Sequence, residues 1–214
     1  MVSTRHLSLY RALAAVIAAG GLVLQCYLSL TRSLSEGQSL SQGLVMFLGY
    51  FTILTNLLVS VALTIPLLAR ESKPAQVLTE SFIVAGIAAS ILFVSLAYHV
   101  LLRSLWNPQG VHLVADDILH YITPALFLIY WFAYMRKGPL RWSDPLVWGI
   151  YPTVYFIYVL VRGEVIGSYP YGFIDVNSIG YPKTLVNAVG LLLIFVILGL
   201  GIVVIDRVSR RAAA

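Results

Sequence analysis

The hydrophobic positions of this chain fall into six long stretches separated by short polar connections. The stretches cover residues 11–30, 44–68, 81–102, 118–135, 146–161 and 185–205. A helix needs about 20 residues to cross about 30 Å of hydrocarbon, and each stretch comes close to that length. The stretches also lack the regular alternation of a membrane β-barrel. The pattern therefore predicts an all-α fold, a six-transmembrane-helix bundle that forms one membrane domain over residues 1–214.

Composition supports the membrane assignment. Apolar residues make up 59% of the chain and charged residues only 11%, against roughly 25% charged residues in an ordinary soluble domain. A soluble core could not bury this much apolar surface, so the solvent must be lipid. The net charge of +5 comes from short basic clusters at the ends of the apolar stretches, which suits membrane lipids and excludes a nucleic-acid surface. Because Cys26 is the only cysteine, an intrachain disulfide and a thiolate metal cage are also excluded.

The distribution of basic residues predicts the orientation. With six spans, both termini lie on one side of the membrane, and ten of the fourteen basic residues lie on that side. They are Arg5, Arg11, Arg70, Lys73, Arg136, Lys137, Arg141, Arg207, Arg210 and Arg211. The positive-inside rule therefore places both termini in the cytoplasm. We expect a multi-pass integral membrane protein, which in a bacterium lies in the cell (plasma) membrane.

Polar residues that could carry chemistry gather near the start of the fourth stretch, at the end of the third and inside the second. The set comprises Thr52, Thr55, Asn56, His99, Trp106, His112, Asp116, Asp117 and His120. Ionisable side chains at the edge of hydrocarbon are costly to place, so they indicate function.

Topology predicts that several members of this set converge. Thr52 should lie about 12 Å below the outer end of the second helix, His99 about one turn from the outer end of the third, and His120 in the first turn of the fourth. Asp116 and Asp117 precede His120 by four and three residues, which puts either carboxylate on the face of the histidine. All of these positions are in the outer half of the bundle.

Two further features bear on this region. Pro124 cannot donate a hydrogen bond to the carbonyl of His120, so we expect a locally open backbone there. The last outer connection, residues 163–176, is rich in aromatic residues that suit the headgroup level. We expect this connection to form a lid over the outer mouth, with Tyr171 and Asp175 as candidate substrate contacts.

Four chemistries could use these residues. A threonine hydroxyl could attack a carbonyl, with a histidine as base and a carboxylate to orient it. His112, Asp116, Asp117 and His120 could bind a divalent metal ion, and His99 with His120 could ligate haem. The same groups could form a proton or ion path. Purely structural roles are also open, since threonines bond their own helix and aspartates cap helices.

Three short segments carry a resemblance to a known family. They read Phe-Thr-Ile-Leu-Thr-Asn-Leu at 51–57, His-Tyr-Ile-Thr-Pro at 120–124 and Tyr-Gly-Phe-Ile-Asp at 171–175. Their order, together with the six-span layout, resembles the androgen-induced (androgen-dependent) membrane hydrolase family and its bacterial six-span relatives. The animal members hydrolyse fatty-acid esters of hydroxy fatty acids with an intramembrane threonine and a histidine.

The resemblance implies that Thr52 is the nucleophile and His120 the base. The chain departs from the animal pattern at Thr55, where that pattern has an acidic residue, and at Gly172, where it has a proline. The spacing from histidine to proline is also one residue shorter here.

Our leading hypothesis is an intramembrane lipid ester hydrolase that uses no metal and no cofactor. Thr52 attacks a fatty-acyl ester, His120 takes the proton, and Asp116 or Asp117 holds the imidazole. The residues expected to contact the substrate are Thr55, Asn56, His99, Tyr171 and Asp175. The alternative is a small transporter or a lipid-binding scaffold that uses the same polar pocket.

Overall fold

The computed structural model describes residues 4–105 and 107–212, and these residues form helices and no strand. Six helical segments are long and apolar enough to cross a membrane. They are Arg5–Ser35, Phe51–Leu68, Ser81–Leu102, Val111–Tyr134, Asp144–Ile166 and Val176–Arg210. The predicted all-α, six-span bundle is confirmed, and the protein is a multi-pass integral membrane protein.

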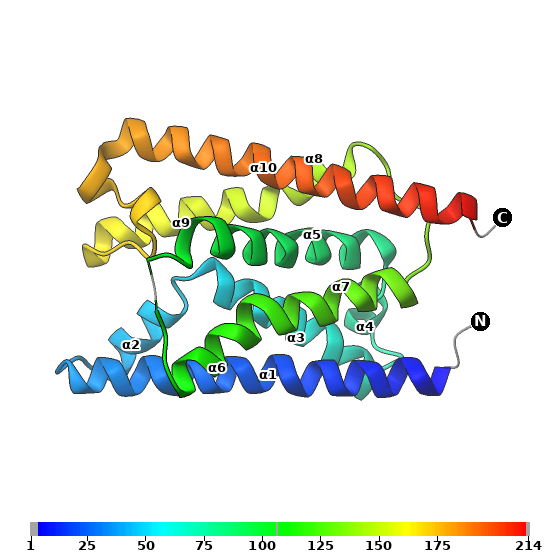
Figure 1. Ribbon diagram of the computed structural model, residues 1–214, viewed down its shortest axis with the longest axis horizontal. Helices are drawn as coiled ribbons and strands as arrows, with labels where there is room; N and C mark the ends of the chain where they lie inside the picture. The colour runs from blue at the N-terminus through cyan, green and yellow to red at the C-terminus, as the bar shows by residue number, and fades with distance from the viewer. Residues whose placement is uncertain (1–3, 106, 213–214) are drawn as a thin grey trace.

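The six spans lie side by side along the long axis of the molecule, with both termini at one end (Figure 1). The principal helices are α1 (Thr4–Ser35), α3 (Phe51–Leu68), α5 (Ser81–Ala97), α7 (Thr123–Tyr134), α9 (Ile150–Ile166) and α10 (Val176–Ala212). The shorter elements are α2 (Leu40–Phe47), α4 (Lys73–Val77), η1 (Tyr98–Leu102), α6 (Val111–Asp117), η2 (Ile118–Ile122), α8 (Asp144–Trp148) and η3 (Gly172–Ile174). We call the end that carries the termini the terminal end and the opposite end the distal end.

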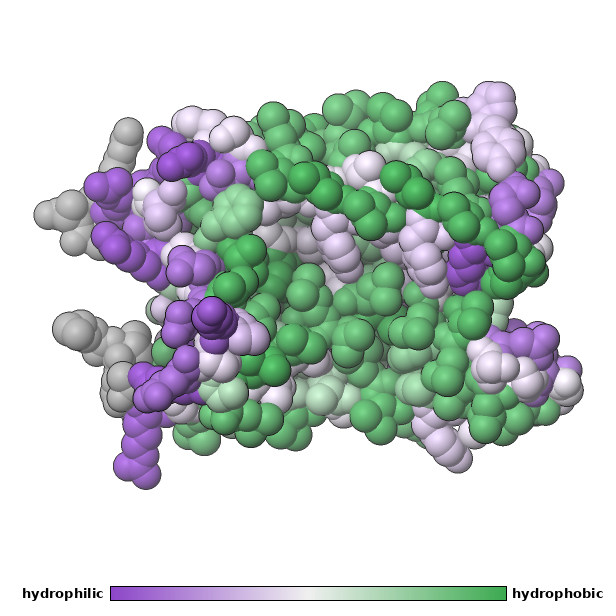
Figure 2. Space-filling model, turned by 180° about the vertical axis from the view of Figure 1, so that it is seen from behind, coloured by the Kyte–Doolittle hydropathy of each residue, from purple (hydrophilic) through white to green (hydrophobic). Residues whose placement is uncertain are grey.

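Apolar side chains cover the middle of the molecule, and polar side chains gather at its two ends (Figure 2). This is the surface that a bilayer requires, because hydrocarbon solvates apolar groups and the headgroup regions solvate polar ones. Within the bundle, α5 packs against α3, α7 and α10, and each of its residues from 84 to 91 is buried. Small residues permit this close packing: a Cβ at Gly86 would lie 2.8 Å from the indole ring of Trp148.

The second span begins later than the sequence pattern predicts. The apolar stretch 44–68 is divided into α2, which ends at Phe47, and α3, which begins at Phe51. A capping box formed by Ser39 and Gln42 starts α2 as a separate helix. The guanidinium of Arg162 packs against Gly49 so closely that a Cβ on Gly49 would lie 2.8 Å from its central carbon. The same guanidinium donates a hydrogen bond to the carbonyl of Val45. Continuous hydropathy cannot reveal such a break.

This break corrects the predicted depth of Thr52. Thr52 is the second residue of α3, so it lies in the first turn of that helix and not about 12 Å inside it. The other boundaries differ from the prediction mainly by extension. The helical segment predicted over 118–135 begins at Val111, because polar residues near the end of a membrane helix lower the local hydropathy without ending the helix. The segment predicted over 185–205 is preceded by a short helical segment that begins at Val176, and a kink at Gly180, whose φ is 74°, separates the two.

Two spans contain a π-helical turn near the distal end. In η1 the N–H of Arg103 bonds the carbonyl of Tyr98, and in η2 the N–H of Thr123 bonds the carbonyl of Ile118. The turn η2 ends at Ile122, just before Pro124. The backbone is therefore irregular in the place where the sequence predicts it from Pro124. A π turn inserts one extra residue into a helix, and such turns frequently occur at functional sites.

The connection between α9 and α10 folds back onto the distal end of the bundle (Figure 1). Gly167 turns the chain with a φ of 70°, a conformation that favours glycine. Ile174 is buried in the main core, with Tyr171 and Phe173 packed against it. Arg162 holds this connection in place by donating a hydrogen bond of 2.9 Å to the carbonyl of Ser168.

Candidate functional site

A threonine, a histidine and an aspartate from two different spans meet near the distal end. Thr52 Oγ1 lies 3.4 Å from His120 Nε2, at the long end of hydrogen-bonding distances. On the other side of the ring, His120 Nδ1 lies 3.0 Å from the carbonyl oxygen of Asp116 and 3.3 Å from its Oδ1. Thr52 and Asp116 are buried, at 9% and 8% exposure. The three side chains therefore form a hydroxyl–imidazole–carboxylate arrangement largely shielded from solvent.

These contacts determine the tautomer of His120. Both groups near Nδ1 are hydrogen-bond acceptors, so the neutral ring carries its proton on Nδ1. The Nε2 lone pair then faces the hydroxyl of Thr52. This is the form in which a histidine can accept a proton from a hydroxyl nucleophile.

Tyr98 extends the arrangement. Its hydroxyl donates a hydrogen bond to Asp116 Oδ2, and its ring stacks on the His120 ring with centroids 3.8 Å apart and an interplanar angle of 13°. One residue thus holds the carboxylate and restricts rotation of the imidazole. Tyr98 is the first residue of η1 and His120 is the third of η2, so both π turns supply this site.

Asn56 links the two helical segments that carry Thr52 and His120. It is fully buried, and its Nδ2 donates to the carbonyl of Thr52 at 2.9 Å and to the carbonyl of Leu119 at 3.2 Å. These carbonyls belong to Thr52 itself and to the residue before His120. Asn56 therefore joins these two backbone segments; the sequence predicts it as a substrate contact, and it lines neither cavity.

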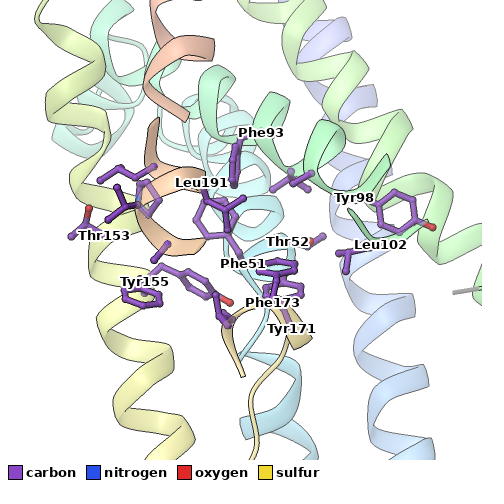
Figure 3. Close-up of a pocket in the computed structure, with 18 of the residues that line it drawn as sticks. Phe51, Thr52, Phe93, Tyr98, Leu102, Thr153, Tyr155, Tyr171, Phe173 and Leu191 are labelled. Carbon is purple, nitrogen blue, oxygen red and sulfur yellow. The ribbon is translucent and has the colours of Figure 1, made fainter. Parts of the chain in front are cut away.

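Two cavities meet at Thr52. The first, of about 240 Å³, is almost wholly apolar and lies among α3, α5, α9 and α10 (Figure 3). The second, of about 480 Å³, is more polar and is lined by His120, Asp116 and side chains of α1 and α2. Thr52, Tyr98, Leu102 and Tyr171 line both cavities. An elongated molecule lying across Thr52 could therefore extend into an apolar space on one side and a polar space on the other.

Tyr171, from the connection between α9 and α10, lines both cavities and lies at their boundary. Its hydroxyl lies close enough to the Thr52 hydroxyl and to the backbone of Phe51 and Thr52 for these groups to influence its pKa. Burial raises the pKa of Tyr171 to about 12, and the hydrogen bonds from Thr52 oppose that rise. The phenol is therefore protonated at neutral pH and can act as a hydrogen-bond donor.

The structure separates other predicted residues from the cluster. His99 is exposed and its Nδ1 lies 3.3 Å from the hydroxyl of Tyr121. The side chain of Asp175 accepts hydrogen bonds from the Asn177 N–H and the Ser178 hydroxyl, which caps the start of α10. Neither residue lines the two cavities.

Thr55, Asp117 and His112 also differ in their placement. Thr55 is fully buried and its hydroxyl lies 3.1 Å from that of Tyr151, outside both cavity linings. The carboxylate beside His120 is that of Asp116, while Asp117 is the last residue of α6. His112 lines the polar cavity. Trp106 lies outside the described residues.

The geometry does not support a metal centre built from these side chains. Across residues 4–105 and 107–212, no group of three or more His, Cys, Asp and Glu side chains is arranged to hold a metal ion. His112, Asp116, Asp117 and His120, considered together as ligands on sequence grounds, are therefore not brought together as a ligand set.

Sequence reasoning missed two tyrosines. Tyr98 adjoins His99 in the sequence, and a tyrosine near a membrane interface is ordinary, so only the stacking on His120 reveals its role. Tyr151 contacts Thr55 from a span almost a hundred residues away, and no local pattern indicates that contact.

Comparison of the chain with protein-family models, with curated proteins and with solved structures finds no match.

Proposed function

We propose that this protein is an intramembrane ester hydrolase that acts on fatty-acyl esters. The observation that carries the proposal is the alignment of Thr52 Oγ1, His120 Nε2 and Asp116, with the histidine in the tautomer that can accept the threonine proton. A threonine hydroxyl is a weak nucleophile at neutral pH and needs such a base. The resemblance to the androgen-induced membrane hydrolases supports the same two residues, Thr52 and His120.

In the proposed first step, the Thr52 oxygen attacks the ester carbonyl carbon and its proton passes to His120 Nε2. The tetrahedral intermediate collapses when the bond to the alcohol oxygen breaks, and His120 returns the proton to that oxygen. An acyl ester of Thr52 remains. Water then attacks this ester while His120 takes a proton from it, and Thr52 leaves with that proton as the fatty acid is released.

The negative oxygen of each intermediate needs hydrogen-bond donors. The backbone N–H groups of Phe51 and Thr52 lie in the first turn of α3, where no acceptor exists within the helix and no side-chain cap is present. The helix dipole adds partial positive charge there. The protonated Tyr171 hydroxyl is next to these groups. We assign the three donors to the oxyanion, a role that preorganised donors often fill in acyl transfer.

A fluorophosphonate probe, which modifies activated hydroxyls, tests the proposal directly. We expect labelling of the wild type in nanodiscs and loss of labelling in Thr52→Ala and His120→Ala. Thr52→Ser should retain labelling because it keeps the hydroxyl. Thr64→Ala, on the same helix but outside both cavities, is the matched control.

Labelling that survives in Thr52→Ala would place the reactive group elsewhere and contradict the mechanism. A folded wild-type protein that is not labelled would instead favour a lipid-binding scaffold or transporter that uses the same cavities.

A further inference from the structure

The apolar cavity is unusually free of available polar groups. Thr153 and Tyr155 line it, but their hydroxyls donate to the carbonyls of Gly149 and Gly49, at 2.7 and 2.9 Å. The Tyr98 hydroxyl is bonded to Asp116. The hydroxyls of Thr52 and Tyr171 remain, at the inner end beside the reactive cluster. The rest of the wall therefore suits a hydrocarbon chain.

The cavity also has residues at its edge that face outward from the bundle. Leu185 and Val189 of α10 line it and are 49% and 57% exposed, and Thr153 of α9 is exposed as well. All three belong to membrane-spanning segments. The cavity thus continues to the lipid-facing surface between α9 and α10. Figure 3 shows its wall running from Thr153 on α9 past Leu191 to Thr52.

We infer that this cavity is an acyl-chain site, filled sideways from the bilayer by one unbranched hydrocarbon chain that passes between α9 and α10. The assignment to the acyl part of a substrate rests on the proposed function, because Thr52 stands at the inner end of the cavity. The alcohol part of the ester then extends into the polar cavity, beside His112 and Arg32, and water reaches the acyl-threonine from the same side.

A chain already dissolved in lipid gains little hydrophobic free energy from entering an apolar cavity, since lipid is as apolar as the wall. The cavity therefore orients the substrate rather than concentrating it, and it places the carbonyl next to Thr52. Closing its mouth should block long chains by steric exclusion.

Photo-crosslinking tests this site without requiring hydrolysis. The probe is palmitic acid with a diazirine in its chain, added to Thr52→Ala protein in phosphatidylcholine nanodiscs, and crosslinked peptides are mapped by mass spectrometry. We expect crosslinks concentrated on residues 152–156 of α9 and 185–192 of α10. Val189→Trp places a bulky side chain at the mouth and should lower their yield about tenfold by steric exclusion.

Val186→Trp is the matched control. Val186 is on the same helix and is 70% exposed, but it does not line the cavity, so this variant should crosslink like its parent. Leu185→Trp is a second mouth variant, in case Val189→Trp does not fold. Equal yields in the mouth variants and the control would overturn the inference, as would crosslinks spread evenly over all lipid-facing helices.

The outcome separates this inference from the proposed hydrolase. Localised crosslinks in a protein that no fluorophosphonate labels would retain the acyl-chain site and reject the enzyme. Labelling of Thr52 together with evenly spread crosslinks would retain the enzyme and reject the site.

Discussion

At the scale of single residues, Tyr98 tests whether the cluster works as a connected unit. Tyr98→Phe removes the hydroxyl that binds Asp116 but keeps the ring that stacks on His120. A hydrogen bond to a charged group contributes about 1.5–3 kcal/mol, so we expect the fluorophosphonate labelling rate to fall by about tenfold or more. The measurement is the second-order rate constant of labelling.

Tyr121→Phe provides the control for that experiment. The Tyr121 hydroxyl contacts His99 and Arg103, and its ring also touches Tyr98, but it does not bind Asp116. Its labelling rate should match the wild type, and Tyr98→Leu, which also removes the stacked ring, should label more slowly than Tyr98→Phe. A wild-type rate for Tyr98→Phe would mean that Asp116 positions the histidine without help.

The limits of sequence reasoning are clear at this scale. Thr52 and His120 could be identified as candidates because ionisable and hydroxyl groups in membrane spans indicate function. Helical spacing relates both Asp116 and Asp117 to His120, so it could not choose between the two carboxylates. His99 and Asp175 attract attention for the same reasons, yet the structure gives them other partners. Residue type signals potential chemistry, whereas only packing between spans decides which groups meet.

At the scale of elements, the π turn η2 contains His120, the proposed base. In an ideal helix each residue turns the chain by about 100°, so the extra residue of a π turn rotates the segment before it by about that angle relative to α7. Pro124 favours the turn because it cannot donate to the carbonyl of His120. The sequence therefore predicts an irregular backbone at η2. No proline accompanies η1, and nothing local predicts that second turn.

Pro124→Ala should restore an N–H able to bond the carbonyl of His120 and so favour a regular α-helix through η2. The rotation would carry His120 away from Thr52. We expect the labelling rate to fall by about tenfold or more while the melting temperature is unchanged or higher, because proline is unfavourable within a helix by roughly 3 kcal/mol. Labelling and thermal unfolding, measured on the same samples, provide the two readouts.

Pro66→Ala is the comparison for that variant, because Pro66 lies inside α3 near the opposite end of the helix from Thr52. It tests whether removal of any helical proline disturbs the site. Unchanged labelling of Pro124→Ala would show that packing against neighbouring helices, rather than the proline, maintains η2.

At the scale of the whole molecule, hydropathy predicts the six spans because burial in lipid is a property of long segments. It fails at the junction of α2 and α3, where a buried Arg162 and a tightly packed Gly49 divide one apolar stretch. That junction bears on the proposed function, since it places Thr52 in the first turn of α3, beside backbone N–H groups that have no acceptor within the helix. The part of the fold that hydropathy misses is thus the part that forms the candidate site.

The asymmetry of charge between the two ends leads to a prediction about orientation. Most basic residues lie with the termini, so the distal end, with Thr52 and both cavity linings, should face away from the cytoplasm. Cys26 is the only cysteine, and Cys26→Ser therefore provides a cysteine-free background. Glu36 directly follows α1, which ends at the distal end, and Glu71 lies between α3 and α4 at the terminal end (Figure 1). Both are exposed and are suitable sites for single cysteines.

In intact cells, a membrane-impermeant maleimide should label Glu36→Cys and should label Glu71→Cys only after the membrane is opened. The predicted orientation would have the proposed hydrolase take its substrates from the outer leaflet, with the polar cavity open to the outer aqueous phase. The reverse labelling pattern would instead place the cluster of Thr52, His120 and Asp116 at the cytoplasmic face. Because the acyl-chain site opens sideways within the bilayer, it remains compatible with either result, and orientation alone decides which leaflet supplies the ester.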